Sequence, residues 1–413
     1  MSLFNNFLSR DSTTTLDAPP PARGQLLLVG EAFASVPKGS TLAGRKVIHA
    51  ATKEDALAQL ASQPFDGLIA GLPEIGKNLS LLNSVTAAHP ALACGLRTDS
   101  ATASKLALAH PVIPAAQSVE ILDDLVRTMF ATARWNADPA FTTLKAEIKR
   151  FPALPSLYAQ ISTALQKEDA SIEILAELIA QEPAISAKLL QVVNSPVFAL
   201  RQRVTSIRDA ANFLGMQRVR ALVLSTSLIG QCDASRCQEF NAESFEIYGL
   251  QMANWASQIT IGETRDRKLA EMAFTAGLLH QFGILLLATN LPESYGQVLR
   301  IASEQNVSIA RVERHTYGVT HAELAGFLLA GWHLPFPIVN AVGFYAQPSH
   351  SEETDFCALT AVHLATAIDT AAHASVPDFD REYLEGLRLT SRLDHWSRTL
   401  VERPWPTEWE KAK

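Results

Sequence analysis

Hydrophobic residues form short runs in the first third of the chain, and these runs predict strands. Residues 25–30, QLLLVG, are apolar and end at a glycine, which is typical of a buried parallel strand. Residues 46–50 and 65–70 repeat the pattern, and residues 53–63 between them have the apolar spacing of a helix. This alternation predicts βαβ units and a doubly wound sheet, completed by strands at 91–96 and 111–113 and by a closing helix at 119–133.

The strand pattern largely ends after residues 135–139, and apolar residues then recur at helical spacing. Ser171 precedes one such stretch as an N-cap, because its side-chain oxygen can accept from a free N–H of the first turn. Further helical stretches are expected at 206–230, 243–261, 267–289, 292–305, 308–315, 320–331, 336–345 and 355–373. The second part of the chain is therefore predicted to be all-helical.

These patterns divide the chain into five parts and predict a multidomain fold. Residues 1–22, which are polar and then proline-rich, are interpreted as a disordered leader. An α/β domain is expected at 23–135, a linker or helix at 136–150 and an all-α domain at 151–395. The tail at 396–413 carries tryptophans and prolines, and it either packs back onto the helical domain or serves as a docking strip.

Length and composition are those of an ordinary globular protein. The chain has 413 residues, enough for two or three domains at roughly 100–200 residues each. Hydrophobic residues make up 47% and charged residues 19%, which argues against a disordered chain. The net charge of -7 provides no general attraction to nucleic acid or anionic lipid.

Cysteine usage and the N-terminus predict a cytoplasmic protein. The four cysteines are scattered, with neither a C-x-x-C pair nor zinc-ligand spacing, so free thiols in a reducing compartment are expected. Residues 1–10 lack the pattern of a signal peptide. The most apolar stretches, 221–230 and 276–288, are shorter than a membrane span, and no membrane association is expected.

Several blocks in the second part of the chain carry the most specific motif signal. They are 151–155 (FPALP), 178–190 (LIAQEPAISAKLL), 193–196 (VNSP) and 207–215 (IRDAANFLG), followed by 276–280 (AGLLH), 321–326 (HAELAG) and 331–335 (GWHLP). Through these blocks, roughly over residues 145–370, the chain resembles the HDOD family. The resemblance implies an all-helical relative of the HD phosphohydrolases with a role in bacterial signalling and regulation.

The HD superfamily binds metal through a histidine, a His-Asp pair and a later aspartate, and the resemblance locates these positions here. Tyr248 falls near the first histidine. His280 keeps the imidazole of the pair, Gln281 replaces its carboxylate, and Thr366 falls near the last aspartate. Anionic oxygens are needed to hold a hard cation that activates water for attack on phosphate. Because both carboxylates are missing, we expect no metal, no cofactor and no catalytic residue.

Two histidines leave an alternative open. His280 and His321 could form part of a zinc or nickel site, with Glu323 as an oxygen ligand. The preferred interpretation is that both are hydrogen-bonded helix histidines inherited from an ancestral pocket. In that interpretation Tyr248, His280, Gln281, His321 and Thr366 are the vestigial HD-site positions.

The first domain resembles a response-regulator receiver, mainly through the spacing of its elements. A receiver keeps an acidic pair after strand one, a phospho-accepting aspartate after strand three, a hydroxyl after strand four and a lysine after strand five. These positions fall here at Gly30 and Glu31, Gly71, Arg97 or Thr98, and Pro114. Phosphoryl transfer needs a carboxylate nucleophile and a magnesium ion held by carboxylates. We therefore expect a flavodoxin-like pseudo-receiver that is not phosphorylated.

Arginines gather around residues 213–216 (FLGM), in a pattern that superficially resembles a helix-turn-helix DNA-binding motif. They are Arg201, Arg203, Arg208, Arg218 and Arg220. DNA contact is not favoured, because the segment belongs to the HDOD blocks and the chain lacks a basic surplus. We interpret the arginines as a solvated, partner-facing strip, with Asn194, Arg201 and Arg203 as candidate interaction residues.

Together these features predict a bacterial signal-transduction protein without catalytic activity, which acts through contacts with unidentified signalling proteins. The competing class is an HD-type metal-dependent phosphohydrolase that acts on a nucleotide or cyclic dinucleotide. A third class is a small-molecule sensor, with its ligand in the vestigial HD pocket. Coupling between the domains is expected to pass through residues 134–150.

Overall fold

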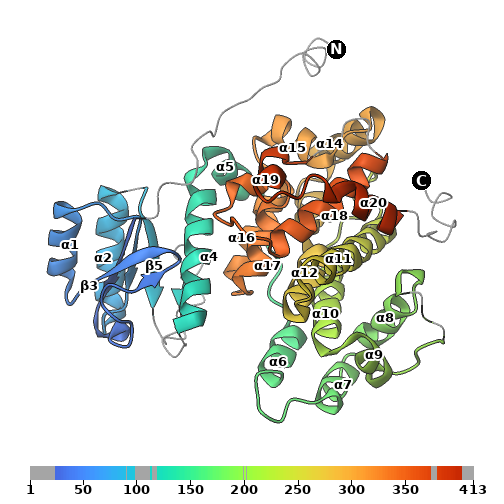
Figure 1. Cartoon of the computed structure of the whole chain (residues 1–413), viewed down its shortest axis with the longest axis horizontal. Coiled ribbons are helices and arrows are strands. Elements are labelled where there is room, and N and C mark those ends of the chain that lie inside the picture. Colours follow the sequence, from blue (N-terminus) through green and yellow to red (C-terminus); the bar gives the residue numbers. More distant parts are fainter. Residues whose placement is uncertain are drawn as a thin grey trace.

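An α/β domain and a larger helical domain lie side by side in the computed structural model (Figure 1). The predicted fold class, a flavodoxin-like α/β domain followed by an all-helical domain, is confirmed. The predicted leader at 1–22 lies outside the described residues. The structure describes residues 24–89, 91–97, 112–113, 119–198, 200, 202–373 and 379–401.

The α/β domain is built on one six-stranded sheet. Its strands are β1 (Gln25–Val29), β2 (Thr41–Leu42), β3 (Arg45–Ala50), β4 (Gly67–Ala70), β5 (Ala93–Arg97) and β6 (Val112–Ile113). The order across the sheet is β2-β3-β1-β4-β5-β6, and every neighbouring pair is parallel except β2 and β3. Without β2 this is the strand order of flavodoxin-like folds. The hydrophobic pattern does not predict β2, because two edge residues are too short to show a period.

Helices cover both faces of the sheet (Figure 1). On one face α1 (Lys53–Ser62) and α2 (Ile75–Ala88) pack against Leu27 of β1 and its neighbours. On the other face α4 (Val119–Ala137) packs against Leu26. Successive strand residues point to opposite faces, so β1 is buried on both sides, in agreement with its uninterrupted apolar sequence.

The helical domain contains many short helices, most of them at the predicted positions. They are α5 (Pro139–Glu147), α6 (Ser156–Ala164), α7 (Ile172–Ala180), α8 (Pro183–Val193), η2 (Pro196–Phe198), α9 (Ile207–Leu214), α10 (Met216–Gln231), α11 (Ala242–Thr264), α12 (Arg267–Leu279), α13 (Phe282–Asn290), α14 (Pro292–Gln305), α15 (Ile309–Tyr317), α16 (His321–Gly331), α17 (Phe336–Phe344), η3 (Pro348–His350), α18 (Ala358–His373), α19 (Arg381–Gly386) and α20 (Arg392–Val401). Two predicted stretches are each divided in two. The stretch 206–230 breaks at Gly215, which has a φ of 87°, and 267–289 breaks at His280.

The stretch Arg267–Asn290 is long and apolar enough to cross a membrane, judged by length and composition alone. It comprises α12 and α13, and 83% of its most apolar window is buried inside the helical domain. Core helices have the same composition when they are covered on all sides. Burial within the domain therefore accounts for the hydrophobicity of this stretch.

Helix α4 belongs to the cores of both domains. One of its faces packs on the sheet through Val126 and Met129, and it also contacts α16 and α17 of the helical domain (Figure 1). Trp135 near its end stacks on Phe344, with ring centroids 5.2 Å apart. The indole also lies against Gly326, where a Cβ atom would come within 2.7 Å of the ring. The helix therefore joins the two domains through tight apolar contacts.

The segment predicted as a linker or helix, 136–150, contains the packed helix α5. Asp138 is its N-cap, and the carboxylate accepts from a first-turn N–H at 2.8 Å. Phe141 is 1% exposed and meets Phe327 of α16 edge on, with ring centroids 5.4 Å apart. This connection is therefore part of the helical core.

The predicted tail at 396–413 begins inside a helix. Trp396 belongs to α20, where its indole is 6% exposed and donates a hydrogen bond to Glu263 at 2.7 Å. Of the two predicted roles of the tail, packing onto the helical domain and docking of a partner, Trp396 therefore has the first. The residues after 401 lie outside the part of the chain that the structure describes.

A nearly buried arginine links the sheet to the segment that follows α17. Arg45 of β3 is 2% exposed, and its guanidinium lies 3.2 Å from Asp66 and 2.5 Å from Glu352. On α4, Arg127 forms a second pair with Glu353 at 2.8 Å. A buried guanidinium keeps its charge and therefore needs carboxylate partners. These pairs help to determine how the two domains face one another.

We expect Glu352→Ala to destabilise the protein, because Arg45 loses one of the two carboxylates it contacts. The free energy of unfolding should fall by about 1–3 kcal/mol, the usual cost of leaving a buried polar group without its partner. Urea denaturation followed by circular dichroism measures this change. Glu293→Ala is the matched control, because Glu293 is 91% exposed and lies 3.8 Å from Arg236, so little change is expected. Equal losses in the two variants would contradict the role given to the Arg45 pair.

Candidate functional site

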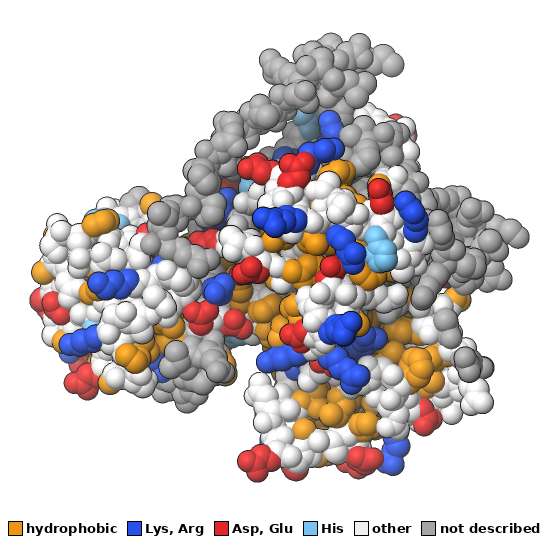
Figure 2. Space-filling model, in the orientation of Figure 1, with side chains coloured by type: hydrophobic (Ala, Val, Ile, Leu, Met, Phe, Trp, Pro, Cys, Tyr) orange, Lys and Arg blue, Asp and Glu red, His pale blue; other side chains and the backbone are white. Residues whose placement is uncertain are grey.

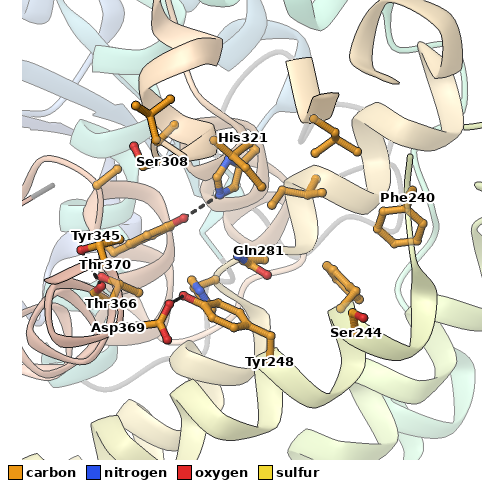
Figure 3. Close-up of a pocket in the computed structure, with 18 of the residues that line it drawn as sticks. Phe240, Ser244, Tyr248, Gln281, Ser308, His321, Tyr345, Thr366, Asp369 and Thr370 are labelled. Carbon is orange, nitrogen blue, oxygen red and sulfur yellow. Dashed lines mark hydrogen bonds between the residues drawn. The ribbon is translucent and has the colours of Figure 1, made fainter. Parts of the chain in front are cut away.

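A cavity of about 510 Å³ lies inside the helical domain (Figure 3). Its walls come from α11, α13, α16 and α18 and from the segments that precede α11 and α15. The five positions that the HD resemblance singles out all line it: Tyr248, His280, Gln281, His321 and Thr366. These side chains come from separate helices or helix ends, so the fold brings them together.

His280 is fully buried, and its imidazole is neutral. Nδ1 lies 2.6 Å from the carbonyl oxygen of Gly277, which can only accept, so Nδ1 carries the proton. Nε2 is then an acceptor, and no donor among the described residues reaches it. Burial lowers the pKa of His280 to about 3. The ring meets Tyr345 edge on, with centroids 4.9 Å apart.

His321 is held at both ring nitrogens. Nδ1 lies 2.6 Å from Oε2 of Glu313, and Nε2 lies 2.6 Å from the hydroxyl of Tyr345. The backbone N–H of His321 also donates to Glu313, at 2.9 Å, and Tyr295 donates to its other oxygen at 2.5 Å. This buried carboxylate thus has several donors that compensate for its removal from water. Burial and the neighbouring Glu313 raise the pKa of Tyr295.

A carboxylate that the sequence analysis did not identify also lines the cavity. Asp369 of α18 accepts a hydrogen bond from the hydroxyl of Tyr248 at 3.2 Å (Figure 3). Burial and this carboxylate raise the pKa of Tyr248. Thr366 donates instead to two carbonyls of its own helix. Asp369 is three residues after Thr366, so the two lie on the same face of a helix, and this spacing could have identified Asp369 from the sequence. No such spacing rule links Glu313 to His321.

These residues do not fit the divalent metal that the HD superfamily implies. Both nitrogens of His321 are engaged, and Gln281 is a neutral amide. The zinc or nickel alternative with Glu323 is wrong, because that carboxylate forms a capping box, 2.6 Å from the N–H and 2.8 Å from the hydroxyl of Thr320. Among the described residues, no group of three His, Cys, Asp or Glu side chains is placed to hold a metal.

The position that corresponds to the phospho-acceptor of a receiver is Gly71, and the aromatic ring of Phe33 packs against it. A Cβ atom at Gly71, directly after β4, would lie 2.6 Å from the ring of Phe33. Gly30 has a φ of 103°, and a Cβ atom there would lie 2.5 Å from the carbonyl oxygen of Gly71. Phe33 is fully buried, and the guanidinium of Arg97 lies 4.9 Å from its ring centre. Position 71 therefore has no room for an aspartate.

Of the remaining receiver positions, Glu31 and Arg97 are described, and two others fall outside the described residues. Glu31 is exposed at the start of the short helix η1 (Glu31–Phe33). Thr98 and Pro114 lie outside the described residues.

The side chain of Asn194 closes a loop, and the residue lines a surface groove together with Arg203, so its contact with a partner stays a prediction. The amide donates to the carbonyls of Leu190 and Val204 at 2.7 and 2.8 Å, and its oxygen accepts from the N–H of Val204 at 2.8 Å. These bonds tie the end of α8 to the residues before α9. Of the other candidate interaction residues, Arg203 is exposed and Arg201 lies outside the described residues.

The arginines of the predicted strip differ in burial and in partner. Arg218 is half-buried and donates to the hydroxyl of Ser257 at 2.9 Å, whereas Arg208 pairs with Glu173 at 3.5 Å. Helix α10, which a helix-turn-helix motif would insert into DNA, is buried at residues 221–224. The burial of α10 argues against its insertion into DNA, whereas the partner-facing strip of arginines stays a prediction, because Arg203 and Arg208 are exposed.

Comparisons with known proteins match the helical part of the chain. Residues 151–348 match the HDOD domain. A curated but uncharacterized protein of Treponema pallidum strain Nichols is 27% identical over 210 residues, which are 50% of this chain and 39% of that protein. This chain therefore spans well under half the length of that relative.

Two solved structures match large parts of the chain. A candidate signal transduction protein from Marinobacter aquaeolei VT8 has a TM-score of 0.53 at 17% identity, and the match covers 85% of each chain. An HDOD domain protein of unknown function from Geobacter sulfurreducens has a TM-score of 0.48 at 18% identity, covering 68% of this chain and 90% of that one. At these identities the Marinobacter structure shows a shared fold alone.

Gly71→Ala should destabilise the α/β domain, because its methyl group meets the ring of Phe33 in a packed core. We expect the free energy of unfolding to fall by about 1–3 kcal/mol. Gly76→Ala is the matched control, since nothing lies within 4 Å of a Cβ atom at Gly76 of α2. Alanine is the better helix former, so this variant should be as stable as the parent or more stable. Thermal denaturation compares the two, and equal effects would argue against a closed acceptor position.

Proposed function

Because residues 151–348 form an HDOD domain, we propose that this chain is a regulatory signalling protein that works without catalysis. It acts in the cytoplasm by binding other signalling proteins, and its α/β domain is a pseudo-receiver. The observation that carries this proposal is that polar side chains at the HD positions hydrogen-bond other protein groups, His321 with Glu313 and Tyr345, and Tyr248 with Asp369.

The hydrogen bonds of His321 support this proposal most directly. In a metal-dependent phosphohydrolase, imidazole and carboxylate ligands point to a shared cation that activates water. Here Nε2 of His321 is hydrogen-bonded to the hydroxyl of Tyr345, and the buried Glu313 carboxylate accepts from His321 and Tyr295. Recruiting these groups to a metal would leave buried partners unsatisfied, which is costly. The hydrogen bonds of His321 and Glu313 are therefore satisfied within the protein.

The α/β domain also supports a function without catalysis. The contact of Gly71 with Phe33 leaves no room for a phospho-accepting side chain. A signal that enters this domain must therefore travel as a change in contacts. Helix α4 and the pair between Arg45 and Glu352 connect the domain directly to the helical one.

The purified chain should perform neither of the reactions that its resemblances imply. Incubation with acetyl phosphate is expected to leave the intact mass of the protein unchanged, because position 71 has no carboxylate nucleophile. Cyclic dinucleotides incubated with the protein and Mn²⁺ should stay intact when followed by chromatography. His280→Ala is the reference variant. Hydrolysis by the parent that disappears in this variant would overturn the proposal in favour of the HD-type phosphohydrolase.

Partner binding should depend on the contact between the domains. Affinity purification of the full chain from bacterial extract is expected to recover a defined protein partner, identified by mass spectrometry. Glu352→Ala loosens the domain contact and should weaken binding of that partner by about fivefold or more, the usual scale of coupling between sites. Glu293→Ala again serves as the control. Unchanged affinity in both variants would show that the domains bind partners independently.

A further inference from the structure

The cavity in the helical domain offers mostly apolar surface to an occupant. Its apolar lining includes Phe240, Phe245, Ile284, Leu299 and Ile309. A volume of about 510 Å³ is typical of sites for small organic molecules. An occupant therefore makes most of its contacts through an apolar body.

Several polar side chains of the lining already have protein partners. Thr366 and Thr370 donate to carbonyls of their own helix, and Tyr248 donates to Asp369. Both ring nitrogens of His321 are hydrogen-bonded as well. These groups therefore have little left to offer a ligand.

Gln281 differs from these groups. It lies between α12 and α13, and its side chain neither caps α13 nor hydrogen-bonds another group among the described residues. The residue is half-buried, and its amide atoms are not enclosed by the protein, so an occupant can reach them. Figure 3 shows this side chain between Phe240 on one side of the space and Thr366 on the other.

The turn that carries Gln281 is fixed in place. The adjacent His280 is fully buried and hydrogen-bonded to a backbone carbonyl at 2.6 Å. The carbonyl of Gln281 itself accepts from the N–H of Ile284 at 2.8 Å. Gly283 lies so close to the carbonyl of His321 that a Cβ atom has no room there, so the turn packs directly on α16. The amide is therefore presented to the cavity from a rigid base.

The chemistry of a glutamine amide defines the group that complements it. The amide has a carbonyl acceptor beside two N–H donors. When an apolar body fills the cavity, water leaves this amide, and a polar group out of water without a partner is costly. A ligand with an N–H beside a C=O compensates both ends of the amide at once. Primary amides and lactams have such an edge.

We propose that the cavity binds a small apolar ring compound with an amide or lactam edge, which pairs with the side chain of Gln281. The ring of the ligand contacts the wall around Phe240. This inference rests on the proposed function, in which the ligand is the signal that the helical domain senses. The amide at the HD position then recognises an organic ligand, where the HD superfamily has a carboxylate that binds metal.

Three probes with one naphthalene body test this edge. They are 2-naphthamide, which has the amide, 2-naphthoate, which has nearly the same shape but is anionic, and naphthalene, which has no polar group. Equilibrium dialysis with the full chain should give 2-naphthamide an affinity at least about tenfold above that of 2-naphthoate. The carboxylate has no N–H for the oxygen of Gln281, and neither lysine nor arginine is among the described residues that line the cavity.

Two variants assign the preference to Gln281. Gln281→Met keeps an unbranched side chain and removes both hydrogen-bonding groups, so 2-naphthamide should bind about tenfold more weakly while naphthalene binding stays the same. Thr370→Val is the matched control, because the Thr370 hydroxyl lines the cavity but donates to carbonyls of its own helix, at 3.0 and 3.1 Å. Its affinities should equal those of the parent. Circular dichroism establishes that both variants are folded.

Three results would overturn the inference. They are binding of 2-naphthoate as tight as that of 2-naphthamide, no binding of 2-naphthamide to the folded parent at its solubility limit, and a Gln281→Met variant in which 2-naphthamide keeps its affinity or loses it to the same degree as naphthalene. None of these affects the proposal of a non-catalytic protein. That proposal fails instead on metal-dependent hydrolysis, which is measured separately.

Discussion

Helix α4 must be covered on two sides, and the arrangement of both domains follows from this need. An amphipathic helix on a sheet normally turns its other face to water. Here the end of α4 carries Trp135, which is 4% exposed because α16 and α17 cover it. The small residues Gly326 and Gly343 let these helices approach the indole. Once α4 is fixed in this way, Arg45 and Glu352 come within hydrogen-bond distance and add a charged contact beside the apolar one.

Buried charges need compensating partners, and this holds for the cavity as it does for Arg45. Glu313 satisfies its charge inside the protein through His321 and Tyr295, and this fixes one wall of the pocket. Asp369 lies on another wall and accepts from Tyr248. The pocket therefore differs from a metal centre in the direction of its carboxylates, which point to protein donors.

The sequence was sufficient to predict the fold class, most elements and the set of residues around the pocket, because each depends on local periodicity or on ordered motif blocks. Strand β1 and helix α18 were predicted from their apolar spacing. Contacts between distant residues could not be predicted in this way. No local rule pairs Glu313 with His321 or Arg45 with Glu352, because those contacts exist only after the helices have packed. The bonds between Asn194 and Val204 could not be predicted either, because they form only when the fold brings the two residues together.

The distance along the chain between Arg45 and Glu352 has a consequence for synthesis. Their contact spans 307 positions, so the α/β domain leaves the ribosome long before its partner surface exists. At about 5–20 residues per second, the delay is roughly 15–60 seconds. Throughout that time the guanidinium of Arg45 lacks Glu352, and the indole of Trp135 lacks its covering helices from the moment it is made. Docking of the α/β domain onto the helical domain is therefore a late step in biogenesis. Until then the nascent chain exposes surface that a chaperone can protect.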